Sequence, residues 1–244
     1  MARAAVLGRL KAPLAWRVAS IAEFVDETPR TRTLVLDVDD WPGHRAGQHV
    51  DIRLTAEDGY QAERSYSIAS GPNNGKLELT VELIEDGEVS PYLVGEAKPG
   101  DTFELRGPIG GWFAWDPSEG GPLLLVGGGS GVAPLRSILR ARPSDVPARL
   151  IYSARTLEDV IYRRELEALG DDVVLTLTRE QREGFRAGRV DQDLLREAGF
   201  SPEQMPRIFV CGPTPFVESV ASELVGLGHA PDRVKTERFG PTGR

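Results

Sequence analysis

The sequence contains few of the residues that build disulfides and metal centres. Its 244 residues include one cysteine, Cys211, and three histidines. A single cysteine excludes a disulfide within the chain, and it excludes an iron–sulfur cluster held by the usual four cysteines. His44, His49 and His229 lack the i, i+3 or i+4 spacing of metal-binding helices and the short spacing of metal-binding hairpins. The sequence therefore predicts no metal centre.

Long hydrophobic runs and an excess of positive charge are also absent. No apolar stretch approaches the length of a membrane-spanning helix, and residues 1–15 do not resemble a secretion signal. The formal net charge of −8 argues against nucleic acid as the main partner, because a phosphate backbone requires a basic surface. We expect a cytoplasmic protein, acting as a monomer, that binds neither nucleic acids nor membranes.

Glycine, in contrast, is concentrated after one apolar stretch. Residues 123–126 are typical of a buried strand, residues 127–131 contain four glycines, and an apolar pattern with helical spacing continues from Val132. Glycines let the backbone approach a ligand closely, and the start of a helix presents unpaired N–H groups to an anion. This strand, turn and helix therefore predict a phosphate-binding site.

Three familiar motifs do not fit this glycine turn. The dinucleotide fingerprint G-x-G-x-x-G, read from Gly127, requires glycine where Val132 stands, and the lysine of a P-loop is absent. A hydrolase elbow G-x-S-x-G around Ser130 fails at Val132 as well. A turn that only tightens the packing of strand and helix is the alternative to a phosphate site.

Apolar and polar residues alternate through the first half of the chain. The alternation is clearest over residues 50–54 and 77–83, and it is typical of half-buried antiparallel strands. Turns rich in glycine, proline and asparagine separate these segments from other candidate strands. The other strands are expected near residues 16–25, 32–38, 63–69 and 102–106. Six short strands predict a small closed antiparallel barrel, which leaves no open edge.

One of these strands does not sort its side chains into core and solvent. Alternation places Arg64 and Tyr66 on one face, and Ser65 and Ser67 on the other. A planar cofactor would use the tyrosine ring for stacking, the Ser67 hydroxyl for a hydrogen bond and the arginine to hold a phosphate. An ordinary strand with a cross-strand tyrosine contact is the alternative.

Strands and helices alternate in the second half of the chain. Apolar strands are expected at residues 122–127, 148–154, 172–178 and 207–211, with helical spacing between most of them. This order predicts a parallel sheet, which binds ligands at the carboxyl ends of its strands. The glycine turn, Ser153-Ala154-Arg155, Thr178-Arg179 and Cys211-Gly212-Pro213 follow these strands, so we expect them to converge on one edge.

Three short motifs occur in order across residues 16–240. They are Arg-Ser-Tyr-Ser at 64–67, the glycine turn with Pro134, and Val-Cys-Gly-Pro at 210–213. Together they resemble the ferredoxin–NADP(+) reductase family, in its bacterial branch of flavin-dependent electron-transfer reductases without an iron–sulfur domain.

The resemblance implies two domains with the active site between them. A flavin-binding, six-stranded antiparallel β-barrel would occupy residues 16–115, after a mobile N-terminal segment over residues 1–15. An NAD(P)-binding α/β domain with a parallel sheet and a C-terminal segment would occupy residues 116–244. We place the boundary near residue 115.

The resemblance also implies the residues that hold the flavin, which would be FAD. Tyr66 would stack on the isoalloxazine ring, Ser67 would lie near its N5 atom, and Arg64 would contact the pyrophosphate. Gly87 and Ser90 belong to a turn that opens a short helix, and they would contact the flavin phosphates. The expected flavin contacts are Arg64, Ser65, Tyr66, Ser67, Val81, Gly87, Val89, Ser90 and Phe239.

The nicotinamide nucleotide is expected on the second domain. The expected contacts are Gly128, Gly129, Gly131, Val132, Pro134, Ser153, Arg155, Arg179, Arg189, Cys211, Gly212 and Pro213. The three arginines resemble those of NADP-using relatives, and no acidic residue ends the strand at Ser153. Guanidinium groups bind a 2′-phosphate, so this pattern favours NADP, with NAD or simply solvated arginines as the alternatives.

Three residues are expected at the reacting atoms by the same resemblance. Cys211 would line the nicotinamide pocket without acting as a nucleophile, and a small buried hydrophobic role is the alternative. Ser67 and Glu237 would lie near flavin N5, and Phe239 would cover the second face of the flavin. The sequence departs from the family here, because residues 240–244 extend beyond the aromatic.

The resemblance implies a flavoprotein oxidoreductase that transfers hydride from NADPH, or NADH, to bound FAD. Direct hydride transfer requires no acid–base pair, and the sequence shows none. Because the chain lacks the cysteines of an iron–sulfur cluster, its electrons would pass to a separate ferredoxin or flavodoxin, or to a small acceptor. The alternatives are an NAD(P)H:flavin reductase with a dissociable flavin and an electron-transfer subunit of a multicomponent oxygenase complex.

Overall fold

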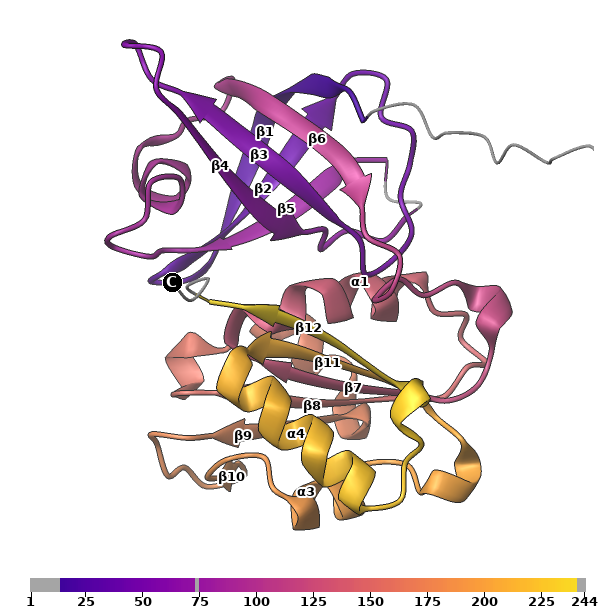
Figure 1. Ribbon diagram of the computed structural model, residues 1–244. Coiled ribbons are helices and arrows are strands. Elements are labelled where there is room, and N and C mark those ends of the chain that lie inside the picture. The colour runs from indigo at the N-terminus through magenta and orange to yellow at the C-terminus, as the bar shows by residue number, and fades with distance from the viewer. Residues whose placement is uncertain (1–13, 73–74, 241–244) are drawn as a thin grey trace, which may run out of the picture.

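The first half of the chain folds into a six-stranded antiparallel sheet. The computed structural model describes residues 14–72 and 75–240. The strands are β1 (Trp16–Thr28), β2 (Thr31–Val38), β3 (His49–Thr55), β4 (Gln61–Ser67), β5 (Leu77–Glu82) and β6 (Thr102–Ile109). Their order is β4-β3-β6-β1-β2-β5, and a bridge between Ile68 and Leu79 joins the two edges at one end (Figure 1). The six predicted antiparallel strands are confirmed.

Alternation of side chains explains this sheet. In β5, Leu77, Leu79 and Val81 are buried while the side chain of Glu78 is directed away from them. The buried residues of β5 pack with Ile21, Leu34, Ile52 and Leu105 of neighbouring strands. A short π-helical turn, η1 (Tyr92–Glu96), covers one end of this core with Leu93.

The second half folds into a six-stranded parallel sheet with helices on both faces. The strands are β7 (Leu123–Gly128), β8 (Ala148–Ala154), β9 (Val173–Leu177), β10 (Arg186–Ala187), β11 (Arg207–Pro213) and β12 (Val234–Phe239), in the order β10-β9-β8-β7-β11-β12. The helices are α1 (Val132–Ala141), α2 (Arg163–Glu167), α3 (Gln192–Ala198) and α4 (Thr214–Gly226). The 3-10 turns are η2 (Pro117–Glu119), η3 (Gly129–Gly131), η4 (Leu157–Asp159), η5 (Gly170–Asp172), η6 (Pro202–Gln204) and η7 (Pro231–Arg233).

The central strand β7 is apolar on both sides because helices cover both faces of the sheet. Leu123 and Leu125 pack in the same cluster as α1, whereas Leu124 and Val126 pack with α3 and α4. Figure 1 shows α1 between the sheet and the barrel, with α4 on the near face of the sheet. None of the described helices is long and apolar enough to cross a membrane.

Two strands of the second sheet escaped the sequence analysis. The edge strand β12 is mostly polar and half-buried without alternation, and β10 is only two residues long. Both lie at the ends of the sheet, where one side of a strand has no strand partner and apolar patterning is weak. The expected segment 1–15 lies almost entirely outside the described residues, and so does the tail after Gly240.

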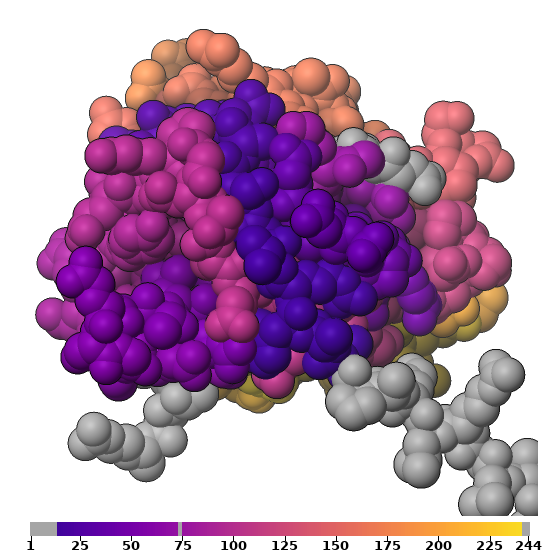
Figure 2. All heavy atoms as spheres, turned by 90° about the horizontal axis from the view of Figure 1, so that it is seen from above, coloured from indigo at the N-terminus to yellow at the C-terminus, as the bar shows by residue number. Residues whose placement is uncertain are grey.

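The segment between the two sheets contacts both of them. The Trp115 backbone N–H donates to the Ala46 carbonyl at 2.9 Å, while its ring is buried in the cluster beneath α1. Phe113 meets Phe209 of β11 edge to face, with ring centroids 5.3 Å apart. Viewed from above, the barrel covers the α/β domain, which emerges at its rim (Figure 2). The boundary near residue 115 stays a prediction.

Truncating Phe209 should destabilise this junction strongly. Its side chain is fully buried, so Phe209→Ala removes the contact with Phe113 and leaves a cavity. We expect a loss of about 3–5 kcal/mol in the free energy of unfolding, measured by urea denaturation. Val225→Ala, at a residue of α4 that is 42% exposed, is the control and should change stability by less than about 0.5 kcal/mol. Equal effects of the two changes would contradict this packing.

Candidate active site

The glycine turn joins β7 to α1 through η3. Gly129 has φ of +56°, which L side chains rarely adopt, and a Cβ built there meets no atom within 4 Å. A Cβ at Gly131 would collide with the backbone carbonyl of Cys211 on β11. Glycine is therefore required at 129 for conformation and at 131 for the close approach of two backbones.

Two further glycines make room for an aromatic ring that the sequence analysis missed. A Cβ at Gly212 would lie 2.7 Å from Cδ1 of Phe216, and a Cβ at Gly128 would lie 3.0 Å from the same atom. Phe216 belongs to the first turn of α4, where nothing in its sequence context distinguishes it from a core residue. The two glycines thus hold the ring of Phe216 beside the turn.

The turn opens into a cavity at the junction of the two domains. The ends of four parallel strands line it through Gly128, Ser153, Thr178 and Pro213, so the predicted convergence on one edge is confirmed. Gly129, Ser130, Arg155 and Phe239 line it as well. Gly131, Val132, Pro134 and Cys211 do not belong to its lining, and Val132 and Pro134 are buried in the first turn of α1.

The barrel contributes the opposite wall of this cavity. Thr28, Arg30 and Thr31, from the turn between β1 and β2, line it together with Glu82 of β5. The Arg30 guanidinium is held by Glu85 at 2.8 Å and by the Leu83 carbonyl at 3.1 Å. The arginine of this turn was visible in the sequence, but nothing local indicated that the turn faces the second domain.

The three expected arginines follow three neighbouring strands. Leu177 of β9 pairs with Ala154 of β8 and with Ala187 of β10, so Arg155, Arg179 and Arg189 follow their strands at similar heights. The Arg179 N–H donates to the Arg155 carbonyl at 2.8 Å. All three side chains are exposed, and none forms a hydrogen bond or ion pair with a described residue. Among the described arginines they share this property with Arg164 alone.

The edge strand β4 leaves part of its inward face uncovered. Tyr66 lies opposite Val50 and Arg64 lies opposite Ile52, both fully buried core residues of β3. Opposed residues of an antiparallel pair point to the same face, yet Tyr66 is only half-buried and the Arg64 side chain is 49% exposed. Burial raises the pKa of Tyr66, so its phenol stays neutral. A planar aromatic group would complete the inward face at this position.

The expected phosphate turn lies beside Arg64. The Arg64 guanidinium donates to Glu88, which also accepts from the Tyr60 hydroxyl. The Ser90 hydroxyl accepts from the backbone N–H of Ile84 at 3.0 Å, so it closes the turn. A Cβ at Gly87 would crowd the Ile84 carbonyl at 2.9 Å and the Ser90 hydroxyl at 3.0 Å. A phosphate held by Arg64 would have to share this guanidinium with Glu88.

Three other expected flavin residues are placed differently. The Ser65 hydroxyl points to the outer face of the barrel, where it donates to Asp51 at 2.6 Å. Val81 and Val89 are fully buried in the barrel core. The Ser65 hydroxyl is therefore not brought together with the Tyr66 ring, and the side chains of the two valines are enclosed by the barrel core.

Ser67 and Glu237 meet across the domain junction. The Ser67 hydroxyl donates to Glu237 Oε1 at 3.1 Å, and Glu237 lies opposite Cys211 in the pairing of β12 with β11. Burial raises the pKa of Glu237, and the hydrogen bond from Ser67 opposes that shift. Burial and the charge of Glu237 raise the pKa of the Cys211 thiol, so it is not a poised nucleophile. Its 1% exposure fits the small hydrophobic role.

The comparisons with known proteins agree with this arrangement. The family model of the oxidoreductase FAD-binding domain matches residues 20–113, and that of the oxidoreductase NAD-binding domain matches residues 125–222. Ferredoxin–NADP reductase B of Sorangium cellulosum is 37% identical over 209 residues, covering 80% of this chain and 84% of the relative. The chain belongs to the ferredoxin–NADP reductase family. The reductase therefore combines an FAD-binding domain with an NAD(P)-binding domain.

Two other similar proteins have names that indicate different electron donors or acceptors. NADH oxidoreductase HCR of Escherichia coli is 34% identical over 219 residues, which cover 87% of the reductase and 65% of that relative. The structure of the cytochrome P450 reductase GcoB of Amycolatopsis matches with a TM-score of 0.84 and 28% identity. That match covers 98% of the reductase and 74% of GcoB.

The residues present fit both cofactors. The open space beyond Gly129 and the strand ends around it suit a dinucleotide, and the uncovered face at Tyr66 suits an isoalloxazine ring. No group of three or more His, Cys, Asp or Glu side chains within residues 14–72 and 75–240 is arranged to hold a metal ion.

The buried Glu237 carboxyl should make the stability of the reductase fall as pH rises. Its pKa is raised above the ordinary value of 4.5, so between that value and the higher folded pKa the folded state binds more protons than the unfolded chain. The free energy of unfolding should therefore fall with pH in the wild type relative to Glu237→Gln, which cannot ionise. Urea denaturation across this pH window measures the difference, and a difference independent of pH would contradict the burial of this carboxyl.

Proposed function

We propose that the reductase oxidises NADPH and delivers the electrons, through FAD, to a separate acceptor protein such as a ferredoxin or flavodoxin. The chemistry that FAD would supply when bound is acceptance of a hydride and release of the electrons to the acceptor. Two observations support this proposal. The glycine turn lines a cavity between the two domains, and the Ser67–Glu237 hydrogen bond crosses the same domain junction next to the half-buried Tyr66.

The side chains of the reductase would bind, orient and exclude water. In this proposal Tyr66 stacks on the flavin ring, Arg64 contacts its pyrophosphate, and Phe239 covers the second face of the ring. Ser67 and Glu237 form a hydrogen-bonded pair in which the hydroxyl proton lies between Ser67 Oγ and Glu237 Oε1. This pair would lie near N5 and hold a polar partner there in a site closed to water.

The unpaired arginines support NADP as the nucleotide. Arg155, Arg179 and Arg189 lie at the carboxyl ends of adjacent strands and form no ion pair with described residues, although most of the arginines that the structure describes do. Arg155 also lines the cavity, and exposed guanidinium groups at these strand ends would bind a 2′-phosphate. NADH is the alternative donor, as the name of the E. coli relative illustrates.

The proposal of a separate electron acceptor rests on the cysteine content of the chain. The chain has one cysteine, so a second redox centre of the four-cysteine type cannot form within it. The similarity to GcoB favours, as a second candidate, the electron-transfer component of an oxygenase system. We further propose that the reductase is cytoplasmic and monomeric, and light scattering of the purified chain would test whether it is a monomer.

A visible spectrum of the purified reductase tests the proposed function. FAD should stay with the protein through gel filtration, and anaerobic NADPH should bleach its absorbance rapidly. Loss of the flavin on the column would instead favour a flavin reductase with a dissociable flavin. Absence of any spectral change on adding either NADPH or NADH would overturn the proposal.

Tyr66→Ala should weaken FAD binding by about 5- to 150-fold, because stacking on an aromatic ring contributes about 1–3 kcal/mol. Tyr66→Phe keeps the ring and should keep the flavin. The measurement is the ratio of flavin to protein after gel filtration, with affinities from fluorescence titration. Equal flavin content in the wild type and the alanine variant would refute the stacking role.

Replacing Arg155, Arg179 or Arg189 with glutamine should raise the KM for NADPH by roughly tenfold or more and leave the KM for NADH unchanged. A hydrogen bond to a charged group contributes about 1.5–3 kcal/mol, and NADH lacks the 2′-phosphate that would accept it. Arg164→Gln is the matched control, because Arg164 is another exposed arginine without a partner. A wild type that uses NADH as well as NADPH would contradict the preference.

A further inference from the structure

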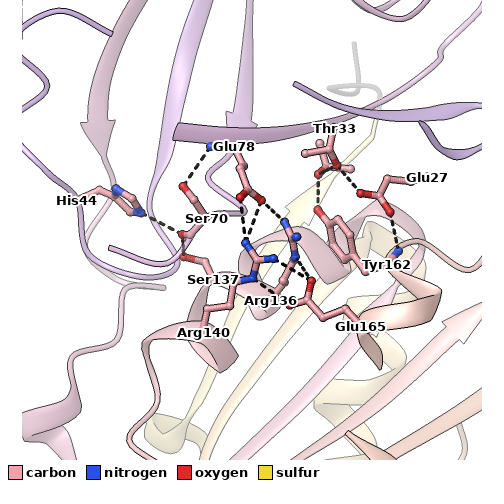
Figure 3. Close-up of polar contacts among 11 residues, drawn as sticks. Glu27, Thr33, His44, Ser70, Glu78, Arg136, Ser137, Arg140, Tyr162 and Glu165 are labelled. Carbon is pink, nitrogen blue, oxygen red and sulfur yellow. Dashed lines mark hydrogen bonds and ion pairs between the residues drawn. The ribbon is translucent and has the colours of Figure 1, made fainter. Parts of the chain in front are cut away.

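Four charged side chains meet where the barrel touches α1 and α2. Arg136 and Arg140, one turn apart on α1, each bridge Glu78 of β5 and Glu165 of α2 (Figure 3). Arg136 donates to Glu165 at 2.8 Å and to Glu78 at 2.5 Å. Arg140 donates to both oxygens of Glu165 at 2.9 and 3.0 Å, and to both oxygens of Glu78 at 3.1 and 3.0 Å.

Two members of this network lie deep in the junction, whereas the side chains of Arg140 and Glu165 are 26% and 34% exposed. The Arg136 side chain is 9% exposed and that of Glu78 is 18% exposed. Burial opposes ionisation of Glu165, yet the hydrogen bonds from Arg140 and Arg136 outweigh it and lower the pKa of this carboxyl. A buried ion pair stabilises little in net terms because its groups lose their hydration, but it is directional and costly to break. Such a network orients the surfaces that it joins.

A tyrosine beside the network belongs to the core of the α/β domain and reaches the barrel through its polar groups. Tyr162 is fully buried, and the Arg136 guanidinium lies 4.1 Å from the centroid of its ring. Its hydroxyl meets that of Thr80, and its backbone N–H donates to Glu27 at 3.1 Å. Tyr162 has φ of +59°, which is unfavourable for a side chain of this size and persists only where the surroundings enforce it.

The network is connected to both halves of the cofactor site. On the barrel side, the Glu78 N–H donates to the Ser70 hydroxyl at 3.1 Å, and the Glu78 carbonyl accepts from Ala69 at 2.8 Å. Ser70 follows Tyr66 and Ser67 by a few residues, and its carbonyl accepts from the Ser137 hydroxyl of α1 at 2.7 Å. On the other side, α1 begins directly after the glycine turn.

We propose that Glu78, Arg136 and Arg140, with the adjacent Tyr162 hydrogen-bonded to the barrel, are positioning residues for hydride transfer. They hold α1, and with it the glycine turn, at a set distance from the strand that carries Tyr66 and Ser67. The nicotinamide bound on one domain would thereby be placed against the flavin bound on the other. This inference rests on the proposed function, because it concerns the geometry of that same site.

Glu165 provides a matched control for Glu78. Both carboxylates accept hydrogen bonds from the same two guanidinium groups, but Glu165 belongs to the α/β domain whereas Glu78 belongs to the barrel. Glu78→Gln therefore weakens the link between the domains, and Glu165→Gln weakens a link within one domain. A purely stabilising network would respond similarly to both changes.

The test is anaerobic stopped-flow reduction of the FAD-loaded reductase by NADPH. Glu78→Gln should lower the rate of flavin reduction at saturating NADPH by about tenfold or more, since small misplacements of reacting atoms are costly. FAD content and NADP affinity should stay unchanged, because Tyr66 and the glycine turn are intact. The flavin of Glu165→Gln should be reduced by NADPH at the wild-type rate. Glu78→Asp restores the negative charge, so its rate of flavin reduction should lie between those of Glu78→Gln and the wild type.

The outcomes separate this inference from the proposed function. If NADPH does not reduce the flavin of the wild-type protein, the proposed function is wrong. Suppose instead that NADPH reduces the flavin of the wild type. The positioning role is then overturned if Glu78→Gln is reduced at the wild-type rate, or if both glutamine variants lose the same share of the rate. If Glu78→Gln does not fold, Arg140→Gln replaces it, since its side chain is 26% exposed and Arg136 still joins the domains. A lower saturating rate with unchanged affinity is expected there too, and an unchanged rate refutes the inference.

Discussion

The hydrogen bond between Ser67 and Glu237 forms only when both sheets and the contact between the two domains are in place. It joins an edge strand of the barrel to an edge strand of the parallel sheet at 3.1 Å, across 170 positions of sequence. It requires β12 to pair with β11 in the register that sets Glu237 beside Cys211. It also requires the barrel to lie against this side of the sheet. A site built from two separately folded halves functions only if their relative position is fixed.

The junction is fixed by polar contacts as well as by apolar packing. Phe113 and Phe209 provide an aromatic contact, but α1 is held by ion pairs to Glu78 and by the Ser137 hydroxyl. Apolar surfaces can slide over each other at little cost, whereas hydrogen bonds between buried groups are lost when the geometry changes. Polar contacts therefore suit a boundary whose spacing matters for the chemistry beside it.

Local sequence patterns predicted most of the fold. The alternation in residues 77–83 predicted β5, and the apolar run followed by glycines predicted β7 and the start of α1, because periodicity reports directly which side of an element is buried. The strand β12 was missed because an edge strand is half-exposed and lacks an apolar pattern. The role of Phe216 was missed because only its contacts with Gly128 and Gly212 distinguish it from a core residue.

The sequence by itself determined the two kinds of sheet, the glycine turn, the family and the residue types that we propose as cofactor contacts. Each of these rests on local spacing, which survives in the linear chain. Only the tertiary structure decided that Ser65 faces outward to Asp51, that Arg64 shares its guanidinium with Glu88, and that Glu78 reaches α1. Those outcomes depend on which strands pair and on how the two domains pack. Contacts between residues far apart in the chain produce no periodic pattern in the sequence, so the sequence does not predict them.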